Sequence, residues 1–353
     1  MTASAPPVAT ASDARRAPRL PRSLTARVMG LIVAITLLAV LLLLSVAVGS
    51  KDIALGTVVD ALVHNTGNGD AYVVWDLRVP RTVVGLSIGV ALGVAGALIQ
   101  ALTRNPLADP GILGVDAGAA FFVTLGIAVF GVTSVGGYVW FAFAGALVVT
   151  LVVYVIGSGG RGGADPLQLT LAGVALGAVL SGIVTAMVLI DPATFDQMRG
   201  WNAGSIVGRG WDILLPVAPF LLIGVVVALL ATPSLNAIAL GDDLATSLGA
   251  NITRTRVLVV VAVTLLAGGS TAIAGPVGFV GLMVPHVARW FTGPDQRWIL
   301  AYTLLLGPSL VLAADIIGRV IVRPGEIPVG IVTAFLGAPV LILLVRRRKV
   351  SGL

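Results

Sequence analysis

Two arginines set three residues apart, Arg78 and Arg81, are the side chains of this sequence best suited to recognise another molecule. Residues three apart lie on one face of a helix, and a guanidinium group pairs with a carboxylate through two parallel hydrogen bonds. Arginines beside an apolar helix also anchor it at the membrane surface, which is the alternative for this pair. Farther along, Asp315 and Arg319 are four apart, which predicts an ion pair within one helix.

Composition excludes most other site chemistry. The 353 residues include no cysteine and two histidines, which excludes disulfides, thiol catalysis and a histidine-rich metal site. The sequence contains no Gly-x-x-x-x-Gly-Lys-[Ser/Thr] phosphate loop and no cluster of nucleophile, base and metal ligand. We therefore expect no catalytic residues, no metal site and no ATP hydrolysis by this chain. Asp116 has no obvious ion-pair partner in the sequence; its side chain could face a watery cavity or take part in a proton relay. His286 is interpreted as a structural residue.

The elements that carry these side chains are apolar. Hydrophobic residues make up 57% of the chain and charged residues 11%, against about 25% charged residues in soluble proteins, so lipid must solvate most of the surface. The basic residues lie between apolar runs and form no patch for nucleic acid. A span needs roughly 20 apolar residues. This length predicts an all-α integral membrane protein with ten spans, near 27–48, 80–103, 111–131, 136–157, 168–190, 212–231, 255–274, 277–291, 299–320 and 328–345.

Ten spans put both termini on one side of the membrane. On that side the count of arginine and lysine is 15, against seven on the other, and the side richer in positive charge is cytoplasmic. We predict a disordered cytoplasmic tail at 1–24, a membrane domain at 25–348 and a second cytoplasmic tail at 349–353. The third and eighth spans contain glycine and proline, which a bilayer tolerates only where protein covers the backbone.

Two further segments have distinctive spacing. Small residues recur every four positions on the fifth span, a pattern typical of helix packing; they are Gly173, Gly177, Ser181 and Thr185. The segment 237–249 is too polar to span, and its Gly-Asp-Asp sequence from Gly241 indicates the start of a short helix. An ordinary interfacial helix is one interpretation of this segment.

Motifs of several residues each follow one another from about residue 75 to residue 348. They are Arg78-Val-Pro-Arg81, Gly96-Ala-Leu-Ile-Gln100, Arg104-Asn-Pro-Leu-Ala-Asp-Pro-Gly-Ile-Leu-Gly-Val115, Leu171-Ala-Gly-Val-Ala-Leu-Gly177, Trp201-Asn-Ala-Gly-Ser205, Gly275-Pro-Val-Gly-Phe-Val-Gly-Leu-Met-Val-Pro-His-Val-Ala-Arg289, Ala314-Asp-Ile-Ile-Gly-Arg319 and Glu326-Ile-Pro-Val-Gly-Ile-Val-Thr-Ala-Phe-Leu-Gly-Ala-Pro339. In this order they resemble the FecCD or BtuC-like permeases, the membrane subunits of ATP-binding cassette (ABC) importers for iron–siderophores, vitamin B12 and haem.

The resemblance implies a ten-helix permease of the BtuC-like, type II importer fold in the cytoplasmic membrane of a bacterium. It implies a second permease subunit, identical or related, and two ATP-binding subunits that use ATP and Mg, while this chain binds no cofactor. An extracytoplasmic binding protein would deliver the cargo, for which we expect an iron–siderophore complex, with vitamin B12 and haem as alternatives. An ion-coupled secondary transporter is the alternative from another class, but apart from Asp116 the spans hold almost no ionisable residue at mid-membrane.

The resemblance also assigns roles to single residues. Arg78, Arg81 and Arg319 are expected to meet glutamates of the binding protein. The fifth span, with Gly173, Gly177, Ser181 and Thr185, is expected to line the translocation path. A coupling helix within about 237–250 is expected to insert into a groove on the ATPase, with the residues Leu240, Gly241, Asp242, Leu244, Ala245, Leu248 and Gly249. The segment 161–166 departs from the family's pattern, so no gate residues are transferred.

Overall fold

The computed structural model describes residues 23–64, 67, 69–159 and 166–348, and all regular elements in these ranges are helices. The tail predicted at 1–24 lies outside the described residues except for Ser23 and Leu24, where the first helix begins. The second tail, 349–353, and most of the segment 161–166 also lie outside them.

Each of the ten predicted spans contains a helix. Seven helical stretches of the described chain are long and apolar enough to cross a membrane: α1 (Leu24–Ala47), the stretch Asp70–Leu102 that ends in α4 (Val79–Leu102), α6 (Val135–Ser158), α7 (Pro166–Ile190), α9 (Trp211–Ile238), α11 (Ile252–Ala274) and α13 (Gln296–Ile321). The other three predicted spans hold α5 (Val115–Ala128), α12 (Val280–Thr292) and α14 (Val329–Arg348). Of these, α5 and α12 have only 14 and 13 residues, because a segment of irregular, non-α-helical backbone precedes each helix.

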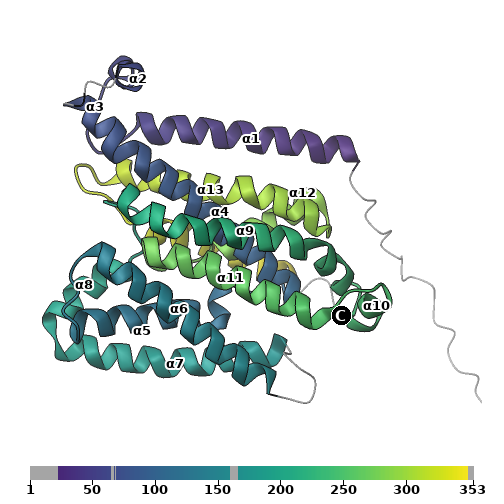
Figure 1. Cartoon of the computed structure of the whole chain (residues 1–353). Helices are drawn as coiled ribbons and strands as arrows, with labels where there is room; N and C mark the ends of the chain where they lie inside the picture. Colours follow the sequence, from purple (N-terminus) through teal and green to yellow (C-terminus); the bar gives the residue numbers. More distant parts are fainter. Residues whose placement is uncertain (1–22, 65–66, 68, 160–165, 349–353) are drawn as a thin grey trace, which may run out of the picture.

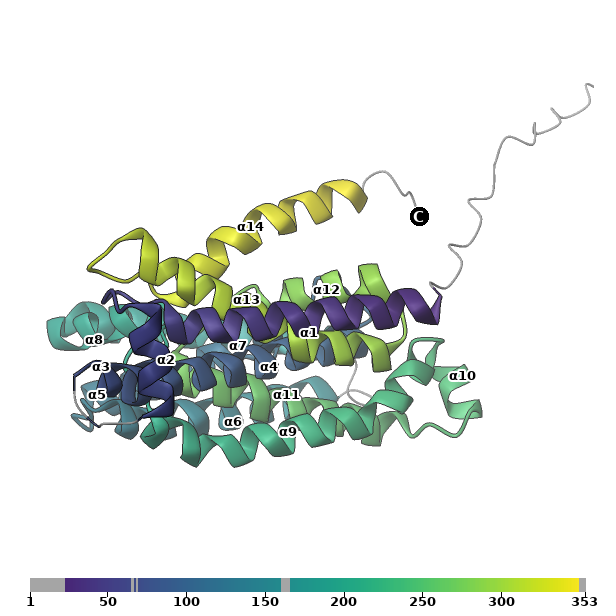
Figure 2. The ribbon, with the colours of Figure 1, turned by 90° about the horizontal axis from the view of Figure 1, so that it is seen from above.

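Short elements lie at the two ends of the bundle. Figures 1 and 2 show α2, α3 and α8 at one end, here called the α2 end, and α10 at the opposite end, called the α10 end. The first described helix begins and the last one ends toward the α10 end. The short elements are α2 (Leu55–Val63), α3 (Asp70–Tyr72), the π-helix η1 (Val73–Arg78), the 3-10 helix η2 (Pro110–Leu113), α8 (Pro192–Asn202) and α10 (Asp242–Ser247).

Helix α4 forms the centre of the bundle and packs against α13, α11, α12 and α9. Glycines allow this close packing, since a Cβ atom on Gly96 would lie 1.9 Å from the carbonyl oxygen of Gly281 in α12. One on Gly89 would lie 2.3 Å from the backbone of Pro308 in α13. Small residues bring helices together where no hydrophobic force acts between them. By contrast, α1 and α7 are mostly exposed within this chain.

The two backbone breaks predicted from glycine and proline pack against each other. The first lies between α4 and α5, where Gly114 has a φ of 76°, and the second lies between α11 and α12, where Gly275 has a φ of 74°. Pro110 of the first break contacts Gly281 beyond the second. The side-chain amide of Gln100 donates to the carbonyl oxygens of Gly281 and Leu282, at 3.1 Å each. Protein therefore covers both breaks, as irregular backbone in a membrane requires.

Candidate functional site

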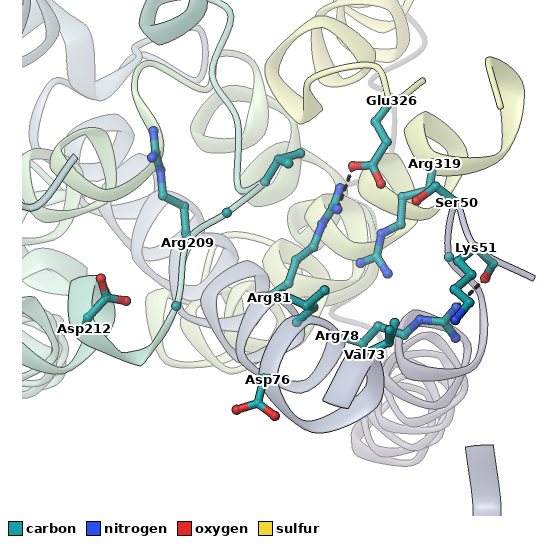
Figure 3. Close-up of a pocket in the computed structure, with 15 residues that line it drawn as sticks. Ser50, Lys51, Val73, Asp76, Arg78, Arg81, Arg209, Asp212, Arg319 and Glu326 are labelled. Atoms are coloured by element: carbon teal, nitrogen blue, oxygen red, sulfur yellow. Dashed lines mark hydrogen bonds and ion pairs between the residues drawn. The ribbon is translucent and has the colours of Figure 1, made fainter. Parts of the chain in front are cut away.

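A cavity of about 540 Å³ lies at the α2 end, and five cationic side chains line it (Figure 3). Four of them are arginines, which come from η1, α4, α13 and the loop before α9. The cationic residues are Lys51, Arg78, Arg81, Arg209 and Arg319. The structure thus brings together the three arginines that the sequence predicted as a group, and it adds Arg209 to them.

Arg78 and Arg319 hold the end of α1. Arg78 donates to the carbonyl oxygens of Val46 and Ala47 at 3.0 and 2.7 Å, and Arg319 donates to that of Ser45 at 2.8 Å. The last carbonyls of a helix have no partner within the helix and carry partial negative charge, which cations stabilise. Both arginine residues are buried, at 4% and 1% exposure. In this conformation both guanidinium groups are therefore satisfied inside the chain.

Arg81 is held by two carboxylates from distant parts of the sequence. Its Nη2 donates to Asp315 at 2.7 Å and its Nη1 donates to Glu326 at 2.7 Å. Asp315, which is 1% exposed, also binds Arg319, so one carboxylate lies between two guanidinium groups. The ion pair predicted between Asp315 and Arg319 is thus confirmed. Removing one member of a buried ion pair leaves an uncompensated charge and costs about 3–5 kcal/mol.

A second cavity, of about 380 Å³, lies between α5, α7 and α8. Gly173, Gly177 and Ser181 of α7 line it, together with Asp116 of α5, whereas Thr185 is exposed and does not line it. Gly173 is also a packing position, because a Cβ atom there would lie 1.9 Å from a carbonyl oxygen of η2. The packing and lining interpretations of this stripe therefore hold on different stretches of one helix.

Asp116, which had no obvious partner in the sequence, accepts a hydrogen bond from the hydroxyl of Thr271 at 2.8 Å. This contact joins α5 to α11 across the wall of the second cavity. His286 packs edge-to-face on Trp290, with 5.5 Å between ring centroids. Among the residues that the structure describes, no group of three or more His, Cys, Asp or Glu side chains could hold a metal ion.

Helix α10 and the residues on either side of it present leucines at the α10 end, with Leu244 in the helix, Leu240 before it and Leu248 after it. Leu240, Leu244 and Leu248 recur every four residues and are between 49% and 63% exposed, whereas Ala245 is fully buried. The exposed apolar face therefore consists of the three leucines, and Ala245 packs inward. Gly241 precedes α10, and Gly249 follows Leu248, so the predicted helix start is confirmed.

Asp242 fastens α10 to the rest of the bundle. Its carboxylate pairs with Arg256 of α11 at 2.9 Å and with Arg104 of the loop after α4. The loop that carries Arg104 leads directly into η2 and the first backbone break. Asp242 was predicted as part of the coupling segment, but the roles of Arg104 and Glu326 were not foreseen, although both lie in motifs that the sequence made conspicuous.

A family model described as the FecCD transport family matches residues 37–347. The chain belongs to the FecCD transport family. The resemblance inferred from the motifs is thereby confirmed, and this FecCD-family chain is a multi-pass permease subunit of an ABC importer. The family's members are permeases, so the enzymatic step of the importer belongs to another subunit. Membership also implies an ATPase partner.

Relatives of this permease cover nearly its whole length. It is 50% identical to the ferric enterobactin transport system permease protein FepD of Escherichia coli (strain K12), over 90% of this chain and 94% of FepD. It is 34% identical to the hemin transport system permease protein HmuU of Yersinia pestis, over 88% of this chain and 94% of HmuU. A solved structure of a metal-chelate type ABC transporter in an inward-facing conformation matches with a TM-score of 0.79 and 27% identity, over 91% of this chain and 99% of that one.

Proposed function

We propose that this permease forms the path by which an iron–siderophore complex crosses the cytoplasmic membrane of a bacterium. The observation that carries the proposal is the cavity beside α7, whose α7 wall includes Gly173, Gly177 and Ser181. Small, weakly polar side chains leave room for a bulky chelate and offer few groups that would retain it. The name of FepD, which is 50% identical, supports this cargo class. Haem is the alternative that HmuU supports, and vitamin B12 is the other alternative within the family.

The α10 end is proposed to face the cytoplasm. The arginine and lysine count of the predicted topology, 15 on the side of both termini against seven on the other, supports this orientation. The leucines in and around α10 would then enter a groove on one of two ATP-binding subunits, which use ATP and Mg. An exposed apolar face at the end of a membrane protein marks an interaction site, and this supports the coupling role of Leu240, Gly241, Asp242, Leu244, Leu248 and Gly249, with Ala245 as the inward anchor.

The α2 end is proposed to receive the extracytoplasmic binding protein. Glutamates of that protein would enter the cavity lined by Arg78, Arg81 and Arg319. Of these, Arg81 lines the cavity and pairs there with Glu326, which lies in the loop that follows α13. Arg78 and Arg319 are reached only if the end of α1 moves, because α1 carbonyls occupy their donors.

Uptake assays test the cargo. Cells that lack the gene should lose uptake of radiolabelled ferric enterobactin, keep uptake of haem and cobalamin, and recover when the wild-type gene is restored. Gly177→Phe, which fills the cavity beside α7 (the path cavity), should restore nothing. The control Gly136→Phe at the start of α6, where a Cβ meets open space, should restore uptake. Unchanged uptake of the iron complex combined with lost uptake of haem would replace the proposed cargo by the alternative.

Copurification tests the coupling surface. Leu240→Glu combined with Leu244→Glu should strip the ATP-binding subunits from the purified permease, because charge replaces the exposed apolar face. The control is Leu55→Glu on α2, a leucine at the opposite end that is 69% exposed. If the double variant retained its ATP-binding subunits, the leucines would not be the coupling surface.

A further inference from the structure

Arg209 differs from the other cations that line the α2-end cavity because it neither pairs with a carboxylate nor caps backbone carbonyls within the described part of the chain. The others that the structure describes there are occupied: Arg78 and Arg319 bind backbone carbonyls, Arg81 binds two acids, and Lys51 pairs with Asp70 at 2.7 Å. Within the described part of the chain, Arg209 forms no ion pair and its buried Nε has no hydrogen-bond acceptor. In Figure 3 its guanidinium group points away from Asp212, the nearest acid in sequence.

Two aromatic contacts fix the direction of this guanidinium group. Its Nη2 donates to the hydroxyl of Tyr138 at 3.2 Å, and its central carbon lies 5.9 Å from the centroid of the same ring. A phenol hydroxyl is neutral, so these contacts orient the guanidinium group without neutralising it. Because no acid neutralises it in the described part of the chain, the guanidinium group keeps its full positive charge beside the cavity.

The loop that carries Arg209 is fastened to the bundle. Ser205 donates from its backbone to the carbonyl of Ala274 at 2.7 Å, at the end of α11. Gly204 accepts from the backbone of Gly330 in α14 at 2.9 Å, and Ile206 is fully buried. Because both contacts tie the loop to long helices, Arg209 is presented in a preset position, which reduces the entropy lost when a partner binds.

We propose that Arg209 receives a carboxylate side chain of the extracytoplasmic binding protein, as a fourth docking arginine of this cavity. The proposal rests on the docking role proposed for the α2 end and extends it to a residue outside the motifs. A carboxylate is the complementary partner because a guanidinium group pairs with it in a planar, bidentate geometry. Unlike the other three arginines, Arg209 can form such a pair without breaking an ion pair or uncapping α1.

The test uses the complete importer, permease with its ATP-binding subunits, in lipid nanodiscs. The probe is the purified binding protein whose deletion abolishes uptake in the same cells, and its affinity is measured by biolayer interferometry at low and high salt. Arg209→Gln should weaken binding by about tenfold or more and flatten the salt dependence. The matched control is Arg199→Gln, an exposed arginine of α8 at the same end, which should change binding by less than about twofold.

A charge exchange separates a direct contact from a structural effect. Arg209→Glu should abolish binding, and one Glu→Lys or Asp→Lys change on the binding protein should restore it. Size-exclusion profiles establish that each variant is assembled. Wild-type affinity for Arg209→Gln, together with weakened binding for Arg81→Gln, would overturn this proposal and leave the docking surface intact. Wild-type affinity for both variants would overturn the docking role of the cavity itself.

Discussion

The guanidinium group of Arg81 pairs with two carboxylates that differ in their surroundings. One edge of its guanidinium group faces Asp315, which is buried between helices, and the other faces Glu326, which lies on a loop. The two carboxylates therefore differ in how easily an incoming carboxylate could replace them as partners of Arg81. Glu326 is suited to be the internal occupant of a position that a glutamate of the binding protein would take.

Glu326→Gln should strengthen docking. The amide keeps the size of the side chain but holds Arg81 less tightly, so an incoming carboxylate competes better, and we expect affinity for the binding protein to rise by about threefold to tenfold. Biolayer interferometry on the importer in nanodiscs measures this. Asp52→Asn is the control, since Asp52 pairs with Arg323 of the same loop and does not touch Arg81. Weaker docking by Glu326→Gln would mean that Glu326 positions Arg81 instead of competing for it.

Asp109 gives stability a dependence on pH. This residue lies between α4 and η2, outside the spans, and burial raises its pKa to about 6, against a backbone hydrogen bond from Gly111 that lowers it. The folded protein therefore holds a proton that the unfolded chain has already released, and stability falls as pH rises from about 4 through 6. Asp109→Asn should remove this loss, so its melting temperature should exceed that of the wild type above pH 6 and approach it below pH 4.

The control for Asp109 is an acid shifted in the opposite direction. Hydrogen bonds from Thr194 lower the pKa of Asp191, the exposed N-cap of α8. Its contribution to stability is therefore present at neutral pH and lost only as pH falls below its ordinary range. Asp191→Asn should be less stable than the wild type at neutral pH. A melting curve of Asp109→Asn that follows the wild type at all pH values would contradict the role of burial.

Sequence reasoning found three of the four arginines of the cavity, Arg78, Arg81 and Arg319, and the helical partner of one of them. Arg81 and Asp315 are 234 residues apart, and no local pattern connects them. The pair Asp315 and Arg319 was predictable because four residues form one helical turn. Arg209 lies between two glycines in a loop, and sequence alone offered no reason to separate it from other arginines that flank a span. Its distinguishing feature, a buried Nε donor that has neither a carboxylate nor a backbone carbonyl in the described part of the chain, is a property of three-dimensional packing.

At the scale of the elements, one side chain connects α10 to the cavity that we propose as the transport path. Asp242 binds Arg104, and the loop that follows Arg104 runs into η2, whose Ile112 carbonyl packs on Gly173 of α7. A displacement of α10 therefore has a direct mechanical route to the wall of the path cavity. The second partner, Arg256, ties the same carboxylate to α11.

Asp242→Asn should uncouple hydrolysis from transport. Loss of the carboxylate weakens both arginine contacts, so α10 would move without displacing the loop, and uptake into proteoliposomes should fall by about tenfold while ATP hydrolysis continues. Its neighbour Asp243, which is exposed, provides the control Asp243→Asn. If transport and ATP hydrolysis fell together, the variant would instead have weakened the binding of the ATP-binding subunits to the permease.

The long helices were predictable, whereas the short ones at the membrane surface were not. Hydropathy located the seven long apolar stretches, because a span needs a run of about 20 apolar residues. Helices α2 and α8 and the π-helix η1 lie at the α2 end, where water and protein replace lipid and the demand is relaxed. Hydropathy also gave no sign that α9 continues to Ile238, seven residues past the predicted span.

At the scale of the whole molecule, a single chain buries only a small part of α7. The helix is mostly exposed, although the cavity proposed as the path lies along it. A second permease subunit that covered this face would close the path between two copies of α7. In the proposed importer, a single chain would therefore supply one wall of the path.

The absence of cysteine makes this arrangement testable with a single introduced thiol. Thr185→Cys, labelled with a benzophenone maleimide and irradiated in the assembled importer, should be cross-linked to the second permease subunit, and mass spectrometry of the adduct would show whether that subunit is identical or related. Leu43→Cys, on the exposed α1, should yield no such adduct. A permease adduct from Leu43→Cys but not from Thr185→Cys would place the subunit interface at α1.

The charge group around Arg81 has a consequence for how the chain is made. Both acids that neutralise Arg81 lie beyond residue 314, whereas the helix that carries Arg81 leaves the ribosome far earlier. During insertion, Arg81 therefore lacks its partners Asp315 and Glu326 until α13 and the loop after it have been synthesised. Translation that stops short of Asp315 would leave this arginine uncompensated, and membrane proteases that remove unassembled helices would have a means to distinguish the truncated product from the finished one.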